Sequence, residues 1–364
     1  MSNLIIAHTD ADGILAARII YLLLDKNADI HFIEWGNFGI TSDAEQVIRE
    51  KTPKTLFILD LGTNKTDVER VLKLKDEVSI DEVYWIDHHP PEVEPREYQR
   101  VDFKIINNPE TCTAGLVYKF AQAFYGNDLN EWIERWTIIG IYGDKAEQGR
   151  LSQEILANLS NKHPYLLATR LFEKSKYVQA QLYAVYFNAP RRVAYHYGAY
   201  LSFKACEEIE SFGSLTLLDS DDLLLLAQYP SVLALKYLVN EYRRVRDEVL
   251  KNVQRILDLG YILLVQISSK FDLGGIVASY IANKYRKPCI VVNYGVPLPI
   301  AKVNCRGVEG LANNIDLGQL MKILGIGGGH PLASAGAIPK NKTLEEFARE
   351  VIEALRQYFE EKRE

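Results

Sequence analysis

The chain has 364 residues and a net charge of −6, and 48% of its residues are hydrophobic. This length favours two domains in a globular protein, and no apolar run reaches the ~18 residues that a membrane span needs. The acidic balance argues against tight binding to long duplex nucleic acid, which favours a basic face, but it is compatible with a short substrate.

The N-terminus and the cysteines indicate a cytoplasmic protein. No basic segment precedes the first apolar run, as it would in a secretion signal. The four cysteines are scattered without a CxxC pair, at Cys112, Cys206, Cys289 and Cys305. We therefore expect reduced thiols and no cysteine-based zinc site.

Short apolar runs and helical patterns alternate in the first part of the chain. The runs predict strands at residues 4–7, 31–35, 55–61, 82–86 and 104–106. Helical patterns lie between them at residues 14–24, 43–50 and 65–74. This alternation is typical of a parallel α/β sheet, in which ligands bind at the carboxyl ends of the strands.

Helical patterns dominate the middle of the chain, at residues 114–184 and 191–259. Residues 237–260 predict a long amphipathic helix that ends at Gly260 and connects two domains. A second α/β unit follows, with strands at 261–267, 288–293 and 300–305 and helices at 274–285 and 343–360. We expect a first domain at 1–188, a helical connector at 189–259 and a second domain at 260–364.

Ligand-type side chains follow the first predicted strand. His8, Asp10 and Asp12 alternate along the chain, so they can face one point, and carboxylates with imidazoles suit Mn²⁺, with Mg²⁺ as a substitute. Gly13 lets the chain turn into a helix whose N-terminus favours a phosphate. The alternative is an aspartate that only caps this helix.

Acids and histidines also follow two later strands. Asp60 ends an apolar run, where a carboxylate is costly unless it is satisfied; it is either a bridging ligand or a turn residue. Asp87, His88 and His89 end another run. One histidine can bind metal and the other substrate, with Asp87 orienting a ring; the alternative is a surface histidine pair.

Two further clusters complete the pattern. Asp144 ends an apolar helix, whose dipole disfavours an anion there, so a nearby cation would explain it; a loop aspartate is the alternative. The glycines before His330 can form an anion-binding nest of backbone N–H groups, although the spacing is not that of a dinucleotide site. Four of the seven histidines lie in these clusters, which favours a site: His8, His88, His89 and His330.

Five motifs together resemble those of the DHH phosphoesterases that carry a C-terminal DHHA1 domain. They are HTDADG, the aspartate of FILDLG, DHHP, the aspartate of GIYGD, and GIGGGHPLASAGA, in the order of the family. The resemblance spans nearly the whole chain. It implies an α/β fold of two domains, a parallel-sheet DHH domain and a smaller α/β DHHA1 domain, joined by a helical connector.

The resemblance also implies roles for single residues. Two Mn²⁺ ions would be held, one by His8, Asp10 and Asp60 and the other by Asp12, Asp60, His88 and Asp144. His89, with Asp87 beside it, would contact the scissile phosphate, and the ions would activate water for in-line attack. The substrate's phosphate or terminal nucleotide would be bound by Arg306, Gly327, Gly328, Gly329 and His330. His8 stands two residues before Asp10 rather than four, which is nearer the RecJ-like pattern than that of small-substrate members.

We expect a manganese-dependent phosphodiesterase, an exonuclease that releases nucleoside monophosphates from short single-stranded RNA or DNA. A phosphodiesterase for cyclic dinucleotides or their linear products, a polyphosphatase and a catalytically silent RecJ-like scaffold stay open as alternatives. The presence of all motif acids argues against the scaffold. Stacking aromatics could come from Tyr142, Tyr195, Tyr197 and Phe271, with core packing as the alternative. A monomer and a homodimer are both compatible with the sequence.

Overall fold

The computed structural model describes residues 2–33, 39–172, 175–308 and 315–361. By internal contacts the chain divides into two compact units, Met1–Val239 and Asn240–Glu364. None of the described helices is long and apolar enough to cross a membrane.

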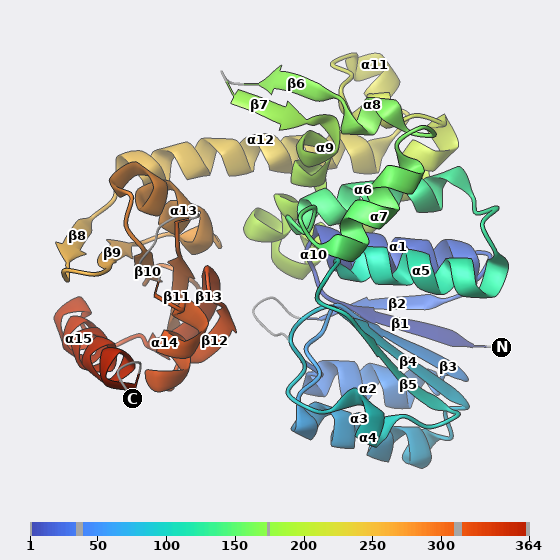
Figure 1. The fold of residues 1–364 in the computed structure, drawn as a ribbon. Helices are drawn as coiled ribbons and strands as arrows, with labels where there is room; N and C mark the ends of the chain where they lie inside the picture. The colour runs from blue at the N-terminus through green and yellow to red at the C-terminus, as the bar shows by residue number, and fades with distance from the viewer. Residues whose placement is uncertain (1, 34–38, 173–174, 309–314, 362–364) are drawn as a thin grey trace. The chain divides into compact units, whose positions relative to one another are not determined.

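The first unit is built on a parallel five-stranded sheet in the order β2-β1-β3-β4-β5 (Figure 1). Its strands are β1 Asn3–Ala7, β2 Asp29–Phe32, β3 Thr55–Leu59, β4 Glu82–Asp87 and β5 Phe103–Asn107. The five strands were all expected from the apolar runs, because a sheet covered on both faces needs nearly continuous apolar strands.

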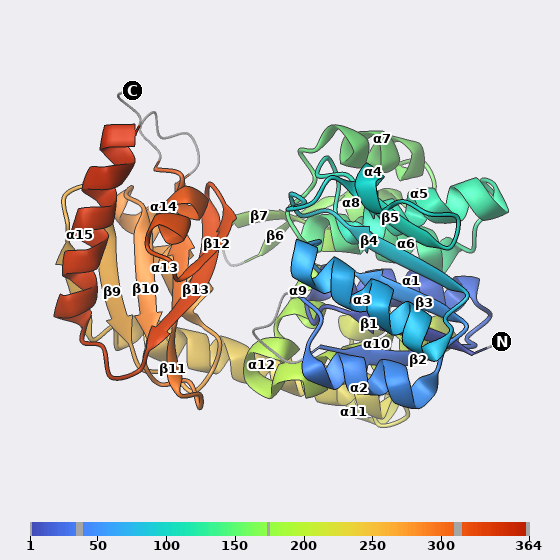
Figure 2. The ribbon, with the colours of Figure 1, turned by 90° about the horizontal axis from the view of Figure 1, so that it is seen from below.

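Helices cover both faces of this sheet. On one face Leu4, Ile6 and Trp85 pack against α2 (Ser42–Lys51) and α3 (Lys65–Val78). On the other face Ile5 and Ile86 pack against α1 (Ala11–Leu23), α5 (Thr113–Tyr125) and α6 (Glu131–Gly143). Figure 2 shows α2 and α3 lying together along the sheet. The alternation of neighbouring residues between two cores fixes the register of the strands.

Further helices pack behind the second face. They are α7 Arg150–Leu159, α8 Pro164–Leu167, α9 Gln179–Asn188, α10 Pro190–Phe212, the 3-10 helix η1 Leu215–Leu218, α11 Leu223–Leu226 and α12 Pro230–Lys251. The short helix α4 Pro95–Tyr98 lies on the first face instead, where Tyr98 packs against the core beneath α2 and α3. Between α8 and α9 the chain forms a short antiparallel hairpin, β6 Thr169–Phe172 and β7 Ser175–Val178. The expectation of a mostly helical stretch at residues 114–184 did not include this hairpin, since its eight strand residues are too few to give a period of their own.

The second unit is built on a mixed six-stranded sheet in the order β12-β13-β11-β10-β9-β8. Its strands are β8 Arg255–Asp258, β9 Leu263–Ile267, β10 Cys289–Asn293, β11 Ile300–Arg306, β12 Gly327–His330 and β13 Ala333–Pro339. Helix α13 (Gly274–Tyr285) packs on one face of this sheet, and α14 (Leu317–Ile323) and α15 (Leu344–Glu361) pack on the other. The expected fold of two α/β domains is thus confirmed.

Two expectations for this region were wrong. The long helix α12 ends at Lys251, not at Gly260, and residues 255–258 form β8, which pairs antiparallel with β9. A short run such as ILDL fits a helix and a strand equally well, and pairing with β9 decides between them. The glycine run is not a loop nest either, because Gly327–His330 forms the edge strand β12 against β13.

The division between the units falls within α12. Val232 and Leu235 of this helix belong to the core of the first unit, whereas Val249 and Leu250 pack against a core cluster of the second. The helix therefore takes part in both cores, which is what a helical connector requires.

Candidate active site

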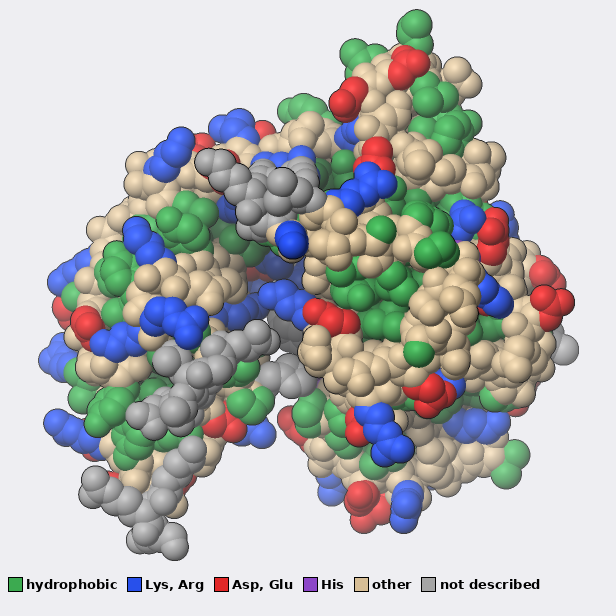
Figure 3. All heavy atoms as spheres, turned by 45° about the horizontal axis from the view of Figure 1, so that its top comes forward, with side chains coloured by type: hydrophobic (Ala, Val, Ile, Leu, Met, Phe, Trp, Pro, Cys, Tyr) green, Lys and Arg blue, Asp and Glu red, His purple; other side chains and the backbone are tan. Residues whose placement is uncertain are grey.

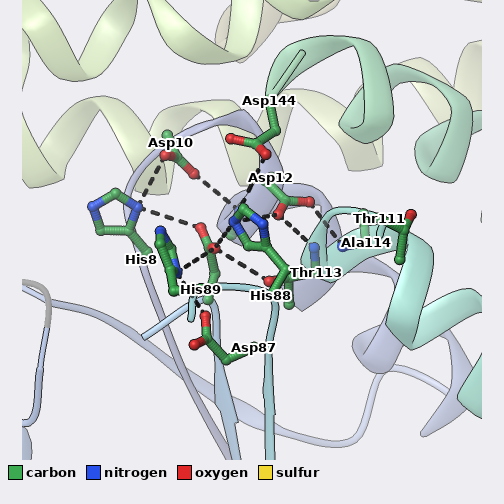
Figure 4. A network of polar contacts seen from close by, with 12 residues as sticks. His8, Asp10, Asp12, Asp87, His88, His89, Thr111, Thr113, Ala114 and Asp144 are labelled. Carbon is green, nitrogen blue, oxygen red and sulfur yellow. Dashed lines mark hydrogen bonds and ion pairs between the residues drawn. The ribbon is translucent and has the colours of Figure 1, made fainter. Parts of the chain in front are cut away.

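The acids and histidines of the first four motifs meet at one edge of the parallel sheet (Figure 4). His8 follows β1, Asp60 follows β3, and His88 follows β4, which are neighbouring strands. Asp144 comes from another element, the C-cap of α6. The carboxyl ends of parallel strands share one edge, so the topology brings together residues that are far apart in the sequence.

Asp10 serves two purposes at once. It is the N-cap of α1, and its Oδ1 accepts a hydrogen bond from the N–H of Gly13 at 3.1 Å. Its other oxygen lies 3.0 Å from Nδ1 of His8. Gly13 itself is required, because a Cβ there would lie 2.5 Å from the carbonyl oxygen of His8. Capping and site interpretations of Asp10 are therefore compatible.

Asp12 is held by the start of α5. The backbone N–H groups of Thr113 and Ala114 donate to its two carboxylate oxygens at 2.6 Å and 2.8 Å. Burial and the neighbouring carboxylates of Asp60 and Asp144 nevertheless raise the pKa of Asp12 well above its usual value. The position of this carboxylate is thus fixed by backbone, and a nearby cation would favour its ionised form.

Asp60 stands at the centre of the cluster in a left-handed conformation, with φ of 60°. Its Oδ1 accepts from the hydroxyl of Thr113 at 3.2 Å and lies 3.4 Å from Nε2 of His88. Its Oδ2 faces Nδ1 of His8 at 3.4 Å but has no hydrogen bond among the described residues. A buried carboxylate in strained backbone is typical of a functional position rather than of an ordinary turn.

His88 lies among three carboxylates. Its Nε2 is 3.4 Å from Asp60, 3.7 Å from Asp144 and 4.0 Å from Asp12. Burial lowers the pKa of His88, but the hydrogen bond to Asp60 and the charges around it outweigh burial and raise the pKa to about 11. With only 6% of its surface exposed, His88 is not part of a surface histidine pair.

His89 is oriented by Asp87. Its Nδ1 lies 2.7 Å from Oδ1 of the fully buried Asp87, and its ring centroid is 4.3 Å from that of His88. The amide of Asn107 donates to the carbonyl oxygen of His89 at 2.8 Å. The pKa of His89 is lowered by burial but raised overall by Asp87 and Asp60. Both the ring and the backbone of His89 are therefore fixed.

The remaining carboxylate, Asp144, is less buried, with 29% of its side chain exposed. Burial, opposed by His88 and aided by Asp60 and Asp10, raises its pKa to about 7. The pKa of His8 is also raised, to about 9, but here burial lowers it and the carboxylates of Asp10 and Asp60 outweigh burial. When no metal ion is bound, protons on these side chains thus compensate the negative charge of the carboxylates.

These residues fit divalent cations. Three groups could each hold an ion, with ligand atoms within 4.8 Å of one another: His8, Asp10 and Asp60; Asp12, His88 and Asp144; and Asp60, His88 and His89. The donors are carboxylate oxygens and imidazole nitrogens, which suit Mn²⁺ and Mg²⁺. A dication would replace the protons that otherwise compensate these buried charges.

The expected substrate-binding residues belong to the second unit. Arg306 ends β11, and its Nη1 donates to the carbonyl oxygen of Cys305 at 2.7 Å. A Cβ placed on Gly275, in the first turn of α13, would lie 3.0 Å from Nη2 of Arg306. Gly327, Gly328 and Gly329 lie on β12, which β13 separates from β11. The side chain of His330 is outside the described part of the chain.

Two residues at the cluster were not foreseen. Asn188 accepts from the N–H of Ala11 and donates to the carbonyl oxygen of Gly143, both at 3.0 Å, so it ties the first motif to the end of α6. Arg191 has Nη2 3.7 Å from Oδ2 of Asp10. Pro190, which breaks the helical pattern between them, was the one sequence signal for a special position.

Comparison with known proteins identifies the family. The DHH family N-terminal domain model matches residues 2–141, and the DHHA1 domain model matches residues 263–361. The chain belongs to the DHH/DHHA1 phosphoesterases. A comparison with curated proteins finds no match.

Solved structures share the fold of this DHH phosphoesterase. RecJ from Thermus thermophilus in complex with Mn²⁺ matches with a TM-score of 0.66 at 18% identity, over 98% of this chain and 52% of that one. An exonuclease RecJ bound to manganese matches with a TM-score of 0.62 at 16% identity, over 98% and 90%. CDC45 from Entamoeba histolytica matches with a TM-score of 0.51 at 9% identity, over 98% and 95%. The chain thus spans about half the length of the Thermus RecJ.

Proposed function

We propose that this phosphoesterase is a manganese-dependent exonuclease that releases nucleoside monophosphates from short single-stranded RNA or DNA. The observation that carries the proposal is the convergence of four carboxylates and three imidazoles on one buried point at the carboxyl edge of the sheet. A site in which several carboxylates lie beside imidazoles is suited to hold two cations, which can in turn bind a phosphate.

We assign one ion to His8, Asp10 and Asp60 and the other to Asp12, Asp60, His88 and Asp144. The three clusters of ligand atoms overlap at Asp60 and His88, which suits a bridging role for Asp60. Two bound cations would lower the pKa of an attacking water and neutralise the charge on the phosphate oxygens.

The chain's own residues prepare the reaction. Thr113 and Ala114 hold Asp12, and Thr113 also donates to Asp60, so the carboxylates are in place before substrate arrives. Asp87 fixes the imidazole of His89, which we assign to the scissile phosphate as a hydrogen-bond donor. This division separates the residues that hold cations from those that orient the phosphate.

The distribution of charge supports a polyanionic substrate. Of the 42 Lys and Arg and the 48 Asp and Glu, residues 240–364 hold 18 and 14, which leaves 24 and 34 for residues 1–239. The second unit is therefore net positive by 4 and the first net negative by 10. In the view of Figure 3, acidic and basic side chains are interspersed over the first unit, with no continuous basic face. Charge asymmetry of this kind favours phosphate binding by the second unit.

Within the second unit, we assign the substrate's terminal phosphate to Arg306 and to β12 with Gly327, Gly328, Gly329 and His330. The guanidinium of Arg306 lies beside the first turn of α13, and a helix N-terminus and an arginine both favour an anion. A short strand of glycines lets a ligand approach the backbone closely.

The test is Mn²⁺-dependent hydrolysis of single-stranded oligonucleotides labelled at the 5′ end, from dinucleotides to about 25 nucleotides, with cyclic di-AMP and polyphosphate in parallel. We expect stepwise shortening with release of mononucleotides. The blank is Asp60→Asn, and the matched control is Asp29→Asn, an exposed aspartate of β2. Turnover only of cyclic di-AMP or polyphosphate would reassign the substrate, and no turnover despite bound metal would favour a scaffold.

A further inference from the structure

The first unit contains a polar cavity that the proposed chemistry does not use. It has a volume of about 930 Å³ and lies where β2 ends, between the start of α2 and the middle of α10. Its lining includes His31, Phe32, Asp43, His196, Tyr197 and Tyr200. A cavity of this size suits a ligand as large as a nucleoside.

The cavity adjoins the metal-ligand cluster through the sheet. The N–H of Ile33, next to Phe32 of the cavity, donates to the carbonyl oxygen of Ala7 at 3.1 Å, and Ala7 directly precedes His8. Neighbouring strands lie about 4.8 Å apart. The cavity is thus one strand away from the cluster, along the same edge of the sheet.

Helix α10 also links the cavity to the metal-ligand cluster. Arg191 in its first turn faces Asp10, and five residues later His196 and Tyr197 line the cavity. Between them the helix is interrupted at Tyr195, whose φ of 52° and ψ of −139° are rare for a residue with a side chain. Strain of this kind persists where the surrounding structure holds it, often at a ligand site. The kink sets the direction in which Tyr197 leaves the helix.

One wall of the cavity offers an aromatic face. Tyr197 is 71% exposed although it is large and apolar, and its ring lies 4.1 Å from that of His196. Tyr200 is fixed by contrast, since its hydroxyl accepts from the N–H of Phe32 at 3.2 Å and its ring packs on Phe32. An exposed ring on a fixed support suits stacking of a flat ligand such as a nucleobase.

The cavity also offers a carboxylate. Asp43 has 57% of its side chain exposed, and its Oδ2 lies 3.2 Å from Nε2 of His31. Burial lowers the pKa of His31, although Asp43 opposes this, and so favours the neutral ring. Glu45 and Asp67 also line the cavity, but Arg70 lines it too and pairs with Glu45 at 3.0 Å and with Asp67 at 3.3 Å. The carboxylate of Asp43 favours a ligand that presents N–H groups.

The hydrogen-bonding groups of the four bases show which base fits this carboxylate. Along its Watson–Crick edge guanine presents two adjacent donors, N1–H and the N2 amino group, which one carboxylate can accept together. Adenine and cytosine place an acceptor beside their amino group, and uracil places acceptors on both sides of N3–H, so each brings a lone pair against the carboxylate.

We propose that this cavity binds the base of the nucleotide next to the scissile phosphate and prefers guanine, which stacks on Tyr197 and donates to Asp43. The placement of the base within a substrate rests on the proposed exonuclease function. The preference for guanine does not, because it can be measured by binding alone.

The test compares the affinities of GMP and AMP for the full chain by ligand-observed NMR, without added metal. Their phosphates are identical, so the difference reports on the base. We expect GMP to bind about tenfold more tightly, as a charge-assisted pair of hydrogen bonds allows. Asp43→Asn should bring the ratio to within about twofold. Asp29→Asn is the matched control, since Asp29 is similarly exposed and also forms one surface ion pair, with Lys51.

A second variant tests the aromatic wall. Tyr197→Ala should weaken both nucleotides by about fivefold or more, because stacking does not depend on the base. Its control is Tyr237→Ala, a tyrosine of α12 that is 68% exposed and does not line the cavity. Equal loss in both tyrosine variants would contradict a stacking role.

Equal affinity for GMP and AMP, or a preference that survives in Asp43→Asn, would overturn the proposal. Rates with the dinucleotides pGpG and pApA separate it from the proposed function. A guanine preference in binding without hydrolysis of either dinucleotide would leave the cavity assignment standing and remove the nuclease. Hydrolysis of both dinucleotides at equal rates, with equal affinity for GMP and AMP, would remove the cavity assignment and leave the nuclease standing.

Discussion

The two units of the chain carry opposite charge, and they expose their chemistry in different ways. The first is net negative and presents buried side chains at the ends of strands, where Asp10, Asp12 and Asp60 are tied to backbone or side-chain donors. The second is net positive and presents backbone on the edge strand β12 together with Arg306. Cations need fixed negative charge, whereas a polyanion needs positive charge and close access to backbone N–H groups.

The contrast predicts different sensitivities to substitution. In the first unit a change of charge without a change of shape should abolish function. In the second unit a change of shape without a change of charge should impair function.

Asp60→Asn should lower the Mn²⁺-dependent rate by about a thousandfold or more, because the proposed bridging charge is lost. The fold should persist, since removing one of several buried carboxylates relieves repulsion around Asp12 and Asp144. The measurements are kcat on the oligonucleotide series and thermal unfolding by circular dichroism. A variant that keeps even a tenth of the wild-type rate would contradict the ligand assignment.

Mn²⁺ should stabilise the chain by about 2.7 kcal/mol at a concentration one hundred times Kd. Thermal unfolding with and without EDTA measures this, and Asp60→Asn should show little of the effect. A shift of equal size in Asp60→Asn would place the ion elsewhere.

The stabilisation by Mn²⁺ should also grow between pH 6 and pH 8. Without metal, the folded-state pKa values of His8 and His88 are raised to about 9 and about 11. Their contribution to stability is therefore complete below the unfolded pKa of about 6.5 and is lost as the pH rises through those folded values. Because Mn²⁺ must displace these protons, raising the pH favours binding. An effect of Mn²⁺ that is flat over this range would exclude the two histidines as ligands.

In the second unit, neighbouring glycines provide a matched pair. A Cβ on Gly327 would lie 2.1 Å from the carbonyl oxygen of Ala335, whereas a Cβ on Gly328 would meet only the end of Lys322 at 3.7 Å. Gly327→Ala should therefore destabilise this unit by about 2 kcal/mol, and Gly328→Ala by much less. Thermal unfolding of both variants measures this difference in stability. If Gly328→Ala is stable but raises KM, the role of β12 in binding is supported.

Asp87→Asn should have the smallest effect, a fall in kcat of about tenfold, because Asp87 orients the imidazole that we propose to contact the scissile phosphate. The affinity for Mn²⁺, measured by calorimetry, should stay the same because Asp87 contacts His89 and not the proposed ligands. A loss of Mn²⁺ affinity instead would place Asp87 among the residues that support the ions.

Much of this arrangement can be predicted from the sequence. The strands of the first sheet follow from apolar runs, and the parallel topology then places Asp10, Asp60 and His88 at one edge. What the sequence does not reveal comes from long-range contacts. The N–H groups of Thr113 and Ala114 exist at every position of a chain, so nothing in the residue types points to their bonds with Asp12. Arg191 and Asn188 reach the cluster only because α9 and α10 pack beside α1.

The misassigned segments have the same origin. Residues 255–258 become β8 because β9 offers a partner, and Gly327–His330 becomes β12 because β13 does. Local patterns of four residues cannot specify such pairing, which depends on the rest of the sheet.

The double use of Asp10 has a consequence for the evolution of the family. One oxygen of this residue caps α1 and the other faces His8. Serine, threonine or asparagine would keep the cap, whereas alanine would also cost about 1 kcal/mol of stability. A lineage that abandons hydrolysis but keeps the fold should therefore drift at this position toward small polar residues. Such a residue at the start of α1 would be a visible trace of a lost metal ion.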